Sequence, residues 1–248
     1  MKLAGLQKLT LLDFPGQLAC TVFTQGCNMR CPFCQNADLV LPERFDGSAL
    51  LEEEDFFTFL ESRKGKLAGV AVTGGEPTLH ADLPQFLGRI REMGFLAKLD
   101  TNGTNPGMLE QIVKAGLVNY VAMDIKNAPS KYALTAGIPQ TQAEDSPAAR
   151  MQKNIQQSIS FLMEDRVPYE FRTTVVDGLH TTEDIVCMAK WLEGARAWYL
   201  QQFIPSERMV GFLGSCECMN MTAPSSQQLL DMCEAARQYV PTVQVRGV

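Results

Sequence analysis

The chain has 248 residues, of which 46% are hydrophobic and 20% are charged, and its formal net charge is −6. This composition is normal for a globular protein and argues against a disordered chain, and the length fits one large domain or two small ones. No apolar run approaches the ~20 residues that cross a bilayer. No block of Lys and Arg stands out either, so neither a membrane nor a nucleic acid is expected as the main partner.

The chain opens with the segment MKLAGLQKLTLLDF, which has no long apolar core followed by a small-residue cleavage site. It is therefore not interpreted as a signal peptide, and we expect a cytoplasmic protein. The sequence also contains eight cysteines. In a reducing compartment, cysteines in a chain of this size indicate metal binding or catalysis rather than disulfides.

Short β-rich runs alternate with amphipathic helical stretches over nearly the whole length. Strands are predicted at 19–24, 69–73, 96–100, 120–125, 169–175 and 198–203, with a further candidate at 242–246. Helices are predicted at 52–63, 83–93, 108–115, 150–165, 182–192 and 225–239. This α/β alternation predicts a parallel sheet with helices outside it, as an open doubly wound sheet or as an incomplete barrel.

Polar motifs stand at the carboxyl ends of successive predicted strands. In order, these are Gly-Cys, Thr-Gly-Gly-Glu-Pro, Asp-Thr-Asn-Gly, Met-Asp-Ile-Lys, the residue Arg172 and Gln-Gln-Phe. Active sites of βα barrels are built at this rim, whereas open sheets bind near one switch point in strand order. The pattern favours an incomplete (βα)6 TIM-like barrel. We expect one domain over 1–248, with a core at about 17–205 and a C-terminal helical and strand extension at about 206–248.

The least regular stretches of the chain are 127–149 and 205–223, and both follow predicted strands at the same rim. Loops at such a rim commonly carry function, so they are candidates for substrate-facing loops. The alternative is that both are ordinary solvent-exposed loops.

Three cysteines follow the first predicted strand within eight residues, at Cys27, Cys31 and Cys34. A closed structural zinc site takes four ligands, but the next histidine is His80, and Cys20 lies in an apolar strand where packing is the better interpretation. Three thiolates instead cap three irons of a cubane cluster and leave the fourth iron open. The alternative is a set of free or disulfide-linked thiols.

This loop resembles the signature of the radical S-adenosylmethionine (radical SAM) superfamily, and the similarity covers roughly residues 5–205. The resemblance implies an incomplete barrel of the radical SAM type and one 4Fe–4S cluster whose open iron binds S-adenosylmethionine (SAM). It also implies reductive cleavage of SAM to a 5′-deoxyadenosyl radical, with the cofactor carrying the difficult chemistry.

The other rim motifs resemble the SAM site of this superfamily. The motif with Gly75 and Glu76 is similar to the one that receives the SAM amino group. Gly75 is expected to let the backbone approach a ligand closely, and Glu76 can accept charge-assisted hydrogen bonds from an ammonium group. Asp100 and Asp124 resemble carboxylates that line a monovalent cation site in glycyl-radical-enzyme activases, where a lysine such as Lys126 pairs with the SAM carboxylate. The implied catalytic residues are Cys27, Cys31, Cys34 and Lys126. The implied cofactor-binding residues are Phe33, Gln35, Gly75, Glu76, Asp100, Thr101, Asp124, Lys126, Arg172 and Gln202.

Plainer interpretations stand beside several of these assignments. The Asp-Thr-Asn-Gly motif contains residues that favour turns on their own. Arg172 could be a structural salt-bridge residue, whereas Asp124 within an apolar strand needs a partner. His80 and His180 are interpreted as satisfied polar residues rather than ligands.

Within the superfamily, the chain resembles the longer anaerobic ribonucleoside-triphosphate reductase activating proteins. The similarity lies in residues 9–16, 131–132 and 135–137, although Phe14 replaces a glycine of the pyruvate formate-lyase activase motif and leaves the role of Asp13 open. The resemblance implies an enzyme that installs a glycyl radical on a partner, an anaerobic ribonucleotide reductase, with electrons from a flavodoxin or ferredoxin. The alternatives are a radical SAM enzyme acting on a small molecule, RNA or another protein side chain, and a non-catalytic zinc-holding interaction protein.

Four further cysteines lie in the second half of the chain. Cys187 and Cys233 fall on apolar faces of predicted helices and are expected to be unligated. Cys216 and Cys218, with Cys233, could bind a second metal, but one intervening residue is unusual for a ligand pair, and free thiols are favoured.

Overall fold

The computed structural model describes residues 1–45, 47, 50–139, 143, 145–213 and 221–247. Its centre is an eight-stranded sheet with the strands in chain order. The strands are β1 (Leu3–Thr10), β2 (Ala19–Thr24), β3 (Gly69–Gly74), β4 (Leu96–Thr101), β5 (Tyr120–Asp124), β6 (Tyr169–Val175), β7 (Trp198–Gln202) and β8 (Gln244–Arg246).

The sheet runs parallel from β2 to β8, and β1 pairs with β2 in the antiparallel direction. The strand order contains no reversal, so the sheet has no switch point of the doubly wound kind. The predicted incomplete barrel is confirmed. It has one more parallel strand than the six-strand core, because the candidate at 242–246 forms β8 at one edge.

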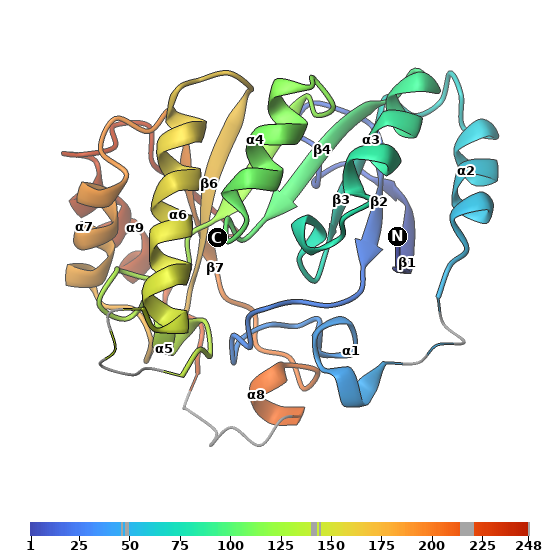
Figure 1. Cartoon of the computed structure of the whole chain (residues 1–248). Coiled ribbons are helices and arrows are strands. Elements are labelled where there is room, and N and C mark those ends of the chain that lie inside the picture. The colour runs from blue at the N-terminus through green and yellow to red at the C-terminus, as the bar shows by residue number, and fades with distance from the viewer. Residues whose placement is uncertain (46, 48–49, 140–142, 144, 214–220, 248) are drawn as a thin grey trace.

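Helices cover the outside of the sheet (Figure 1). The long ones are α2 (Glu53–Glu61), α3 (Leu83–Glu92), α4 (Pro106–Lys114), α6 (Pro147–Met163), α7 (Thr182–Trp191) and α9 (Ser226–Ala236). Three helices of four residues, α1 (Ala37–Val40), α5 (Tyr132–Thr135) and α8 (Val210–Leu213), lie beyond the carboxyl ends of the strands. No helix in the described part of the chain is long and apolar enough to cross a membrane.

The six predicted helices and six core strands are present, with ends that differ by at most three residues. Capping explains several helix starts. Ser146 accepts a hydrogen bond from the Ala149 amide at the start of α6, and Thr181 forms a reciprocal capping box with Asp184 at the start of α7. Three short helices and β1 were not predicted from the sequence. A single helical turn contains too few residues to show periodicity.

Side chains at alternate positions of each strand point into the barrel. Asp100, Asp124 and Arg172 line a cavity at the rim, so Lys98 and Glu170, two residues earlier on β4 and β6, face the same interior. Both are only 1% exposed. The lower interior of the barrel is therefore polar, although its walls between sheet and helices are a continuous apolar core.

Glu170 is paired within this lower interior. The Arg246 guanidinium donates to both carboxylate oxygens over 3.0 and 2.9 Å, and the Tyr120 hydroxyl donates over 3.0 Å. Arg246 also lies 3.3 Å above the ring of Tyr199. These contacts tie β8 to β5, β6 and β7. Elsewhere, Asp13 accepts a hydrogen bond from the Thr21 hydroxyl of β2, which gives it a structural partner.

Candidate active site

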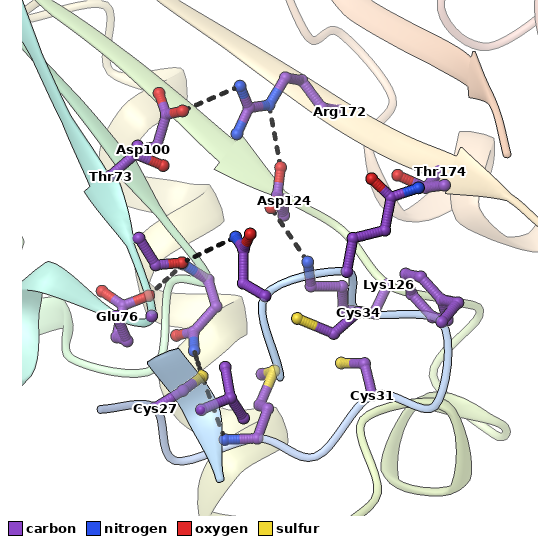
Figure 2. Close-up of a pocket in the computed structure, with 18 of the residues that line it drawn as sticks. Cys27, Cys31, Cys34, Thr73, Glu76, Asp100, Asp124, Lys126, Arg172 and Thr174 are labelled. Atoms are coloured by element: carbon purple, nitrogen blue, oxygen red, sulfur yellow. Dashed lines mark hydrogen bonds and ion pairs between the residues drawn. The ribbon is translucent and has the colours of Figure 1, made fainter. Parts of the chain in front are cut away.

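A cavity of about 390 Å³ opens at the carboxyl ends of the parallel strands. Figure 2 shows the thiols of Cys27, Cys31 and Cys34 on one side of it and the charged residues of β4, β5 and β6 on the other. The cavity is lined by every residue that the sequence analysis assigned to the site, namely Cys27, Cys31, Cys34, Phe33, Gln35, Gly75, Glu76, Asp100, Thr101, Asp124, Lys126, Arg172 and Gln202.

The cysteine loop is held by its own backbone and by one arginine. Arg30 donates to the carbonyl oxygens of Cys27 and Met29 over 2.7 and 2.8 Å. The amide of Cys34 donates to the Cys31 carbonyl over 3.0 Å. These contacts turn the chain back on itself, so that three cysteines close in sequence line one wall of the cavity.

Two segments from elsewhere in the chain support this loop from outside. The Arg30 amide donates to the Ala136 carbonyl, and a Cβ on Gly137 would lie 2.3 Å from the Arg30 oxygen, so this turn tolerates no side chain. On the other side, the amides of Val210 and Gly211 donate to the carbonyls of Cys34 and Pro32. The described parts of 127–149 and 205–223 therefore include supports of the cysteine loop, which the sequence analysis did not anticipate.

Gly75 allows a close approach between two strand ends. The sequence analysis expected it to let the backbone approach a ligand. In the structure, a Cβ on Gly75 would lie 1.9 Å from the Gly26 oxygen, and the next amide, of Glu76, donates to that oxygen over 2.8 Å. Gly74 has φ +120° and would place a Cβ 2.3 Å from the Thr24 amide nitrogen. The double glycine thus seats the start of the cysteine loop against β3.

The Glu76 carboxylate is occupied by the chain itself. One oxygen accepts from the Thr78 amide and hydroxyl and from the Thr101 hydroxyl, and the other accepts from the Asn102 amide over 2.6 Å. Burial raises the pKa of Glu76, and these four hydrogen bonds oppose that rise. This differs from the expected role of the side chain as an acceptor for an ammonium group. It makes Glu76 a positioning residue that joins the ends of β3 and β4.

Asn28 and Asn102 form a link that the sequence analysis missed. The Asn102 amide donates to the Asn28 side-chain oxygen over 2.9 Å, and Asn28 donates to the Thr104 hydroxyl over 2.8 Å. This network fixes the cysteine loop to the end of β4. The sequence shows an asparagine in the cysteine loop and another in the Asp-Thr-Asn-Gly motif. A single sequence, however, cannot show that two residues so far apart form a hydrogen bond.

Five charged side chains form a chain of ion pairs across β4, β5 and β6. Lys98 pairs with Asp100, which lies 3.1 Å from the Arg172 guanidinium. The same guanidinium lies 2.9 Å from Asp124, which is paired with Lys126 over 3.0 Å (Figure 2). The expected partner for Asp124 is thus present. Lys98 was not predicted as part of the site. Its position inside the apolar strand 96–101 could have indicated a buried lysine that needs an acidic partner.

The ion pairs keep Asp124, Lys126 and Arg172 in their charged forms. Burial alone would raise the pKa of Asp124, but Arg172 and Lys126 hold that pKa well below its ordinary value. Burial alone would lower the pKa of Lys126, and Asp124 beside it instead raises it. The same holds for Arg172, whose pKa is raised by Asp100 and Asp124 against the effect of burial. The cavity therefore presents fixed positive charge.

The three cysteines fit a cluster better than a single metal ion. Across the described residues, no three His, Cys, Asp or Glu side chains are arranged to hold one metal ion. A cubane cluster takes each thiolate on a different iron, so its ligands need not meet at one atom. Burial raises the pKa of Cys27 to about 11 and of Cys31 to about 12. Binding a cluster therefore requires loss of the thiol protons.

Other predicted residues have defined places. The Gln35 amide donates to the Ile204 carbonyl over 2.6 Å, and that of Gln202 donates to Pro224 over 2.9 Å. His80 contacts the Gln25 carbonyl, and His180 contacts the Lys126 carbonyl over 2.8 Å, so both are satisfied as expected.

The remaining described cysteines are free thiols. Cys20 is fully buried in β2 and Cys233 is buried in α9, as expected. Cys187 is exposed, so its placement on an apolar face was wrong. Cys216 and Cys218 lie outside the described residues.

Comparisons with known proteins found a matching family model and several similar proteins. A family model described as the radical SAM superfamily matches residues 21–144, from β2 past the end of α5. A Methanocaldococcus jannaschii protein with the inferred name glycyl-radical enzyme activating enzyme is 29% identical over 250 residues, covering 99% of this chain and 95% of the relative. The pyruvate formate-lyase-activating enzyme of Streptococcus mutans is 27% identical over 215 residues, covering 81% and 75%.

Solved structures share the fold. Streptococcus suis SuiB, in a crystal structure with bound S-adenosylmethionine, superposes with a TM-score of 0.63 at 14% identity, covering 91% of this chain and 51% of SuiB. At this identity the likeness concerns the architecture alone. It matches the incomplete barrel described above.

Proposed function

This chain belongs to the radical SAM superfamily, and on that premise we propose that it is an activase that installs a glycyl radical on a partner enzyme. The superfamily implies a 4Fe–4S cluster and SAM. One observation carries the proposal: the three cysteines and the charged residues of three strands line a single cavity at the barrel rim. Its walls combine thiols for iron with fixed charges for a zwitterionic ligand.

We assign roles to the chain's own residues. Cys27, Cys31 and Cys34 hold the cluster, and the cations Lys126 and Arg172 attract the SAM carboxylate. The backbone at Gly74 and Gly75 takes the amino group, because the Glu76 carboxylate is already used by Thr78, Thr101 and Asn102. Phe33, Gln35 and Gln202 line the remaining wall, where the nucleoside would lie. When bound, the cluster and SAM supply a 5′-deoxyadenosyl radical under reducing conditions.

Other parts of the chain support this site by packing and by backbone contacts. Val210, Ala37, Val40 and Leu41 form a small apolar cluster packed against Cys27 and Cys34. This cluster gives two of the three thiols an apolar wall on one side. His180 contacts the carbonyl oxygen of Lys126, and the Tyr132 hydroxyl donates to the carbonyl oxygen of Asp124. These two contacts orient the charged pair.

For the partner, we propose an anaerobic ribonucleoside-triphosphate reductase, with a flavodoxin or ferredoxin as electron donor. Abstraction of a hydrogen atom from one partner glycine would leave the glycyl radical. An exposed apolar side chain at the cavity suits a protein partner, since Ile204, which lines the cavity, is 67% exposed. Similarity along almost the whole length of the M. jannaschii relative supports the activase class.

We also propose that residues 1–248 form one domain in the cytoplasm. The extension after 205 contributes β8 to the common sheet and two amides to the cysteine loop, which favours a single unit. The free state of the described cysteines suits a reducing compartment.

Anaerobic reconstitution tests the proposal. The protein is loaded with iron and sulfide, reduced, and mixed with SAM and either the reductase or a peptide that carries its C-terminal glycine. We expect 5′-deoxyadenosine and a glycyl radical signal in electron paramagnetic resonance. Cys31→Ser should abolish both, while Cys187→Ser, at an exposed thiol outside the cavity, should leave both unchanged.

The outcomes separate the alternatives. Cleavage of SAM without a glycyl radical on any glycyl-radical enzyme would favour a small molecule, RNA or another side chain as substrate. Zinc without iron in anaerobically purified protein would reject radical chemistry.

A further inference from the structure

Every carboxylate oxygen of Asp100 and Asp124 is paired with a cation of the protein. Each of the four oxygens has its own partner: Lys98 and Arg172 on Asp100, and Arg172 and Lys126 on Asp124. Arg172 contributes two different nitrogens, Nη1 to Asp100 and Nε to Asp124. The guanidinium therefore lies between the two acids and binds both.

This position is where the resemblance to activases implies a monovalent cation. A metal cation would need carboxylate oxygens as ligands, and hard cations take several of them at short distance. Here each of these oxygens already faces an ammonium or guanidinium group, whose positive charge would repel a metal cation. The residues present do not fit a metal cation at this place.

The charge balance points the same way. The chain of ion pairs contains three cations, Lys98, Arg172 and Lys126, and two carboxylates, so one positive charge is in excess. The neighbouring carboxylate of Glu76 is surrounded by hydroxyl and amide donors instead of these cations. The chain of ion pairs, with its excess positive charge, repels an added cation and attracts an anion.

Burial keeps the arrangement in place. Lys98 is 1% exposed, and the side chains of Asp100 and Arg172 are 13% and 16% exposed. The strand register supports it, because Arg172 on β6 stands beside Asp124 on β5. A buried arginine with two partners has little freedom to leave, and its planar fork matches two carboxylates.

We propose that Arg172 takes the place of a metal cation between Asp100 and Asp124, so that this enzyme binds the SAM carboxylate without a monovalent or divalent cation. The inference rests on the proposed function only for the identity of the anion. The bridging itself is a property of the protein without SAM.

Two measurements in choline, sodium, potassium and magnesium chloride at equal ionic strength test it, on the reconstituted protein. The first is the melting temperature without SAM, because a cation that binds only the folded state raises it. The second is the dissociation constant of SAM. For the wild type we expect equal melting temperatures in all four salts and SAM dissociation constants that agree within about threefold.

Arg172→Gln opens the space between the two acids, and Arg172→Lys is the matched control that keeps one charge there. We expect sodium or potassium to raise the melting temperature of Arg172→Gln above that in choline and to recover about tenfold in SAM affinity. Arg172→Lys should respond less to either salt.

A metal-dependent melting temperature of the wild type would overturn the inference. So would a folded Arg172→Gln protein that responds to no cation. If SAM fails to bind the wild type in any salt, the proposed function fails, while the melting curves still decide the role of Arg172.

Discussion

Glu170 and Arg172 stand on the same inward face of β6, and their surroundings differ in charge balance. Around Arg172, at the rim, three cations meet two carboxylates and one positive charge is left over. Around Glu170, deeper in the barrel, one guanidinium meets one carboxylate, and a phenol completes the hydrogen bonds. The rim cluster therefore has an excess positive charge that can attract an anionic ligand, whereas the charges of the deep cluster cancel.

The difference separates two uses of buried charge. A balanced pair such as Glu170 with Arg246 joins β8 to the sheet and specifies how the edge strand docks. An unbalanced network such as the rim chain costs desolvation without full compensation, so it points to a ligand of opposite sign. Substitutions should therefore affect binding in one cluster and stability in the other.

The largest effect is expected at the rim. Lys126→Met removes the excess positive charge, and we expect SAM affinity to fall by about 30- to 100-fold, as for loss of a charge-assisted contact. Isothermal titration of the reconstituted protein measures it. Lys153→Met, at an exposed lysine of α6, is the control and should bind normally. Equal affinity of Lys126→Met and wild type would remove Lys126 from the site.

The deep cluster should respond in stability. Glu170→Gln leaves the Arg246 guanidinium without its counter-charge, and we expect a loss of about 2 kcal/mol in the free energy of unfolding. SAM affinity should stay within about twofold of the wild type. Chemical denaturation and titration measure the two quantities, with Glu234→Gln at an exposed position as control. A large loss of SAM affinity would contradict the division between the clusters.

A loss of similar size, about 2 kcal/mol, is expected for Arg246→Met, because this change leaves the Glu170 carboxylate, which is 1% exposed, without its counter-charge. Part of this loss comes from the contact with the Tyr199 ring. The double variant with Glu170→Gln should cost less than the sum of the two single losses, because both remove one pair. Additive losses would mean that the pair contributes nothing to stability.

The smallest effect concerns pH. The folded pKa of Asp124 lies below its ordinary value of 3.8 because Arg172 and Lys126 stabilise the carboxylate. The ion pairs therefore contribute their full stability above the unfolded pKa and lose it as the pH falls through the folded pKa. Arg172→Gln should raise that pKa towards the unfolded value, so the variant, which is already less stable at neutral pH, should lose less stability on acidification than the wild type, by about 1 kcal/mol between about pH 5 and about pH 3. Thermal unfolding between neutral and acidic pH measures it, and parallel curves would contradict the assignment.

Much of the fold could be predicted because its elements are long and periodic. The apolar runs of β2 to β7 and the helices between them follow the expected patterns closely. β1 was missed because its burial follows no alternation, as the structure shows only Leu3 and Thr10 buried in it. The short helices α5 and α8 lie at backbone contacts with the cysteine loop, made by Ala136, Val210 and Gly211, and such long-range contacts cannot be predicted from local sequence.

The composition of the site could be predicted, but its internal pairing could not. Motifs at strand ends identified Cys27, Asp100 and Lys126 as neighbours in space, because parallel strands end at one rim. That Arg172 would bridge Asp100 and Asp124 depends on strand register and on side-chain length, which appear only in three dimensions. The donors to Glu76 could not be predicted either, because they also depend on the three-dimensional arrangement of the strand ends. These donors hydrogen-bond to the carboxylate that the motif had suggested for a ligand.

Gly75 lies so close to the Gly26 carbonyl that position 75 has no room for a side chain. Any side chain at 75 would strike the Gly26 oxygen, and relief of that clash requires the start of the cysteine loop to move. The contact therefore couples the end of β3 to this loop, although 48 residues separate the two glycines in the chain. A residue without a side chain thereby helps to set where Cys27, the first thiol of the cavity wall, lies.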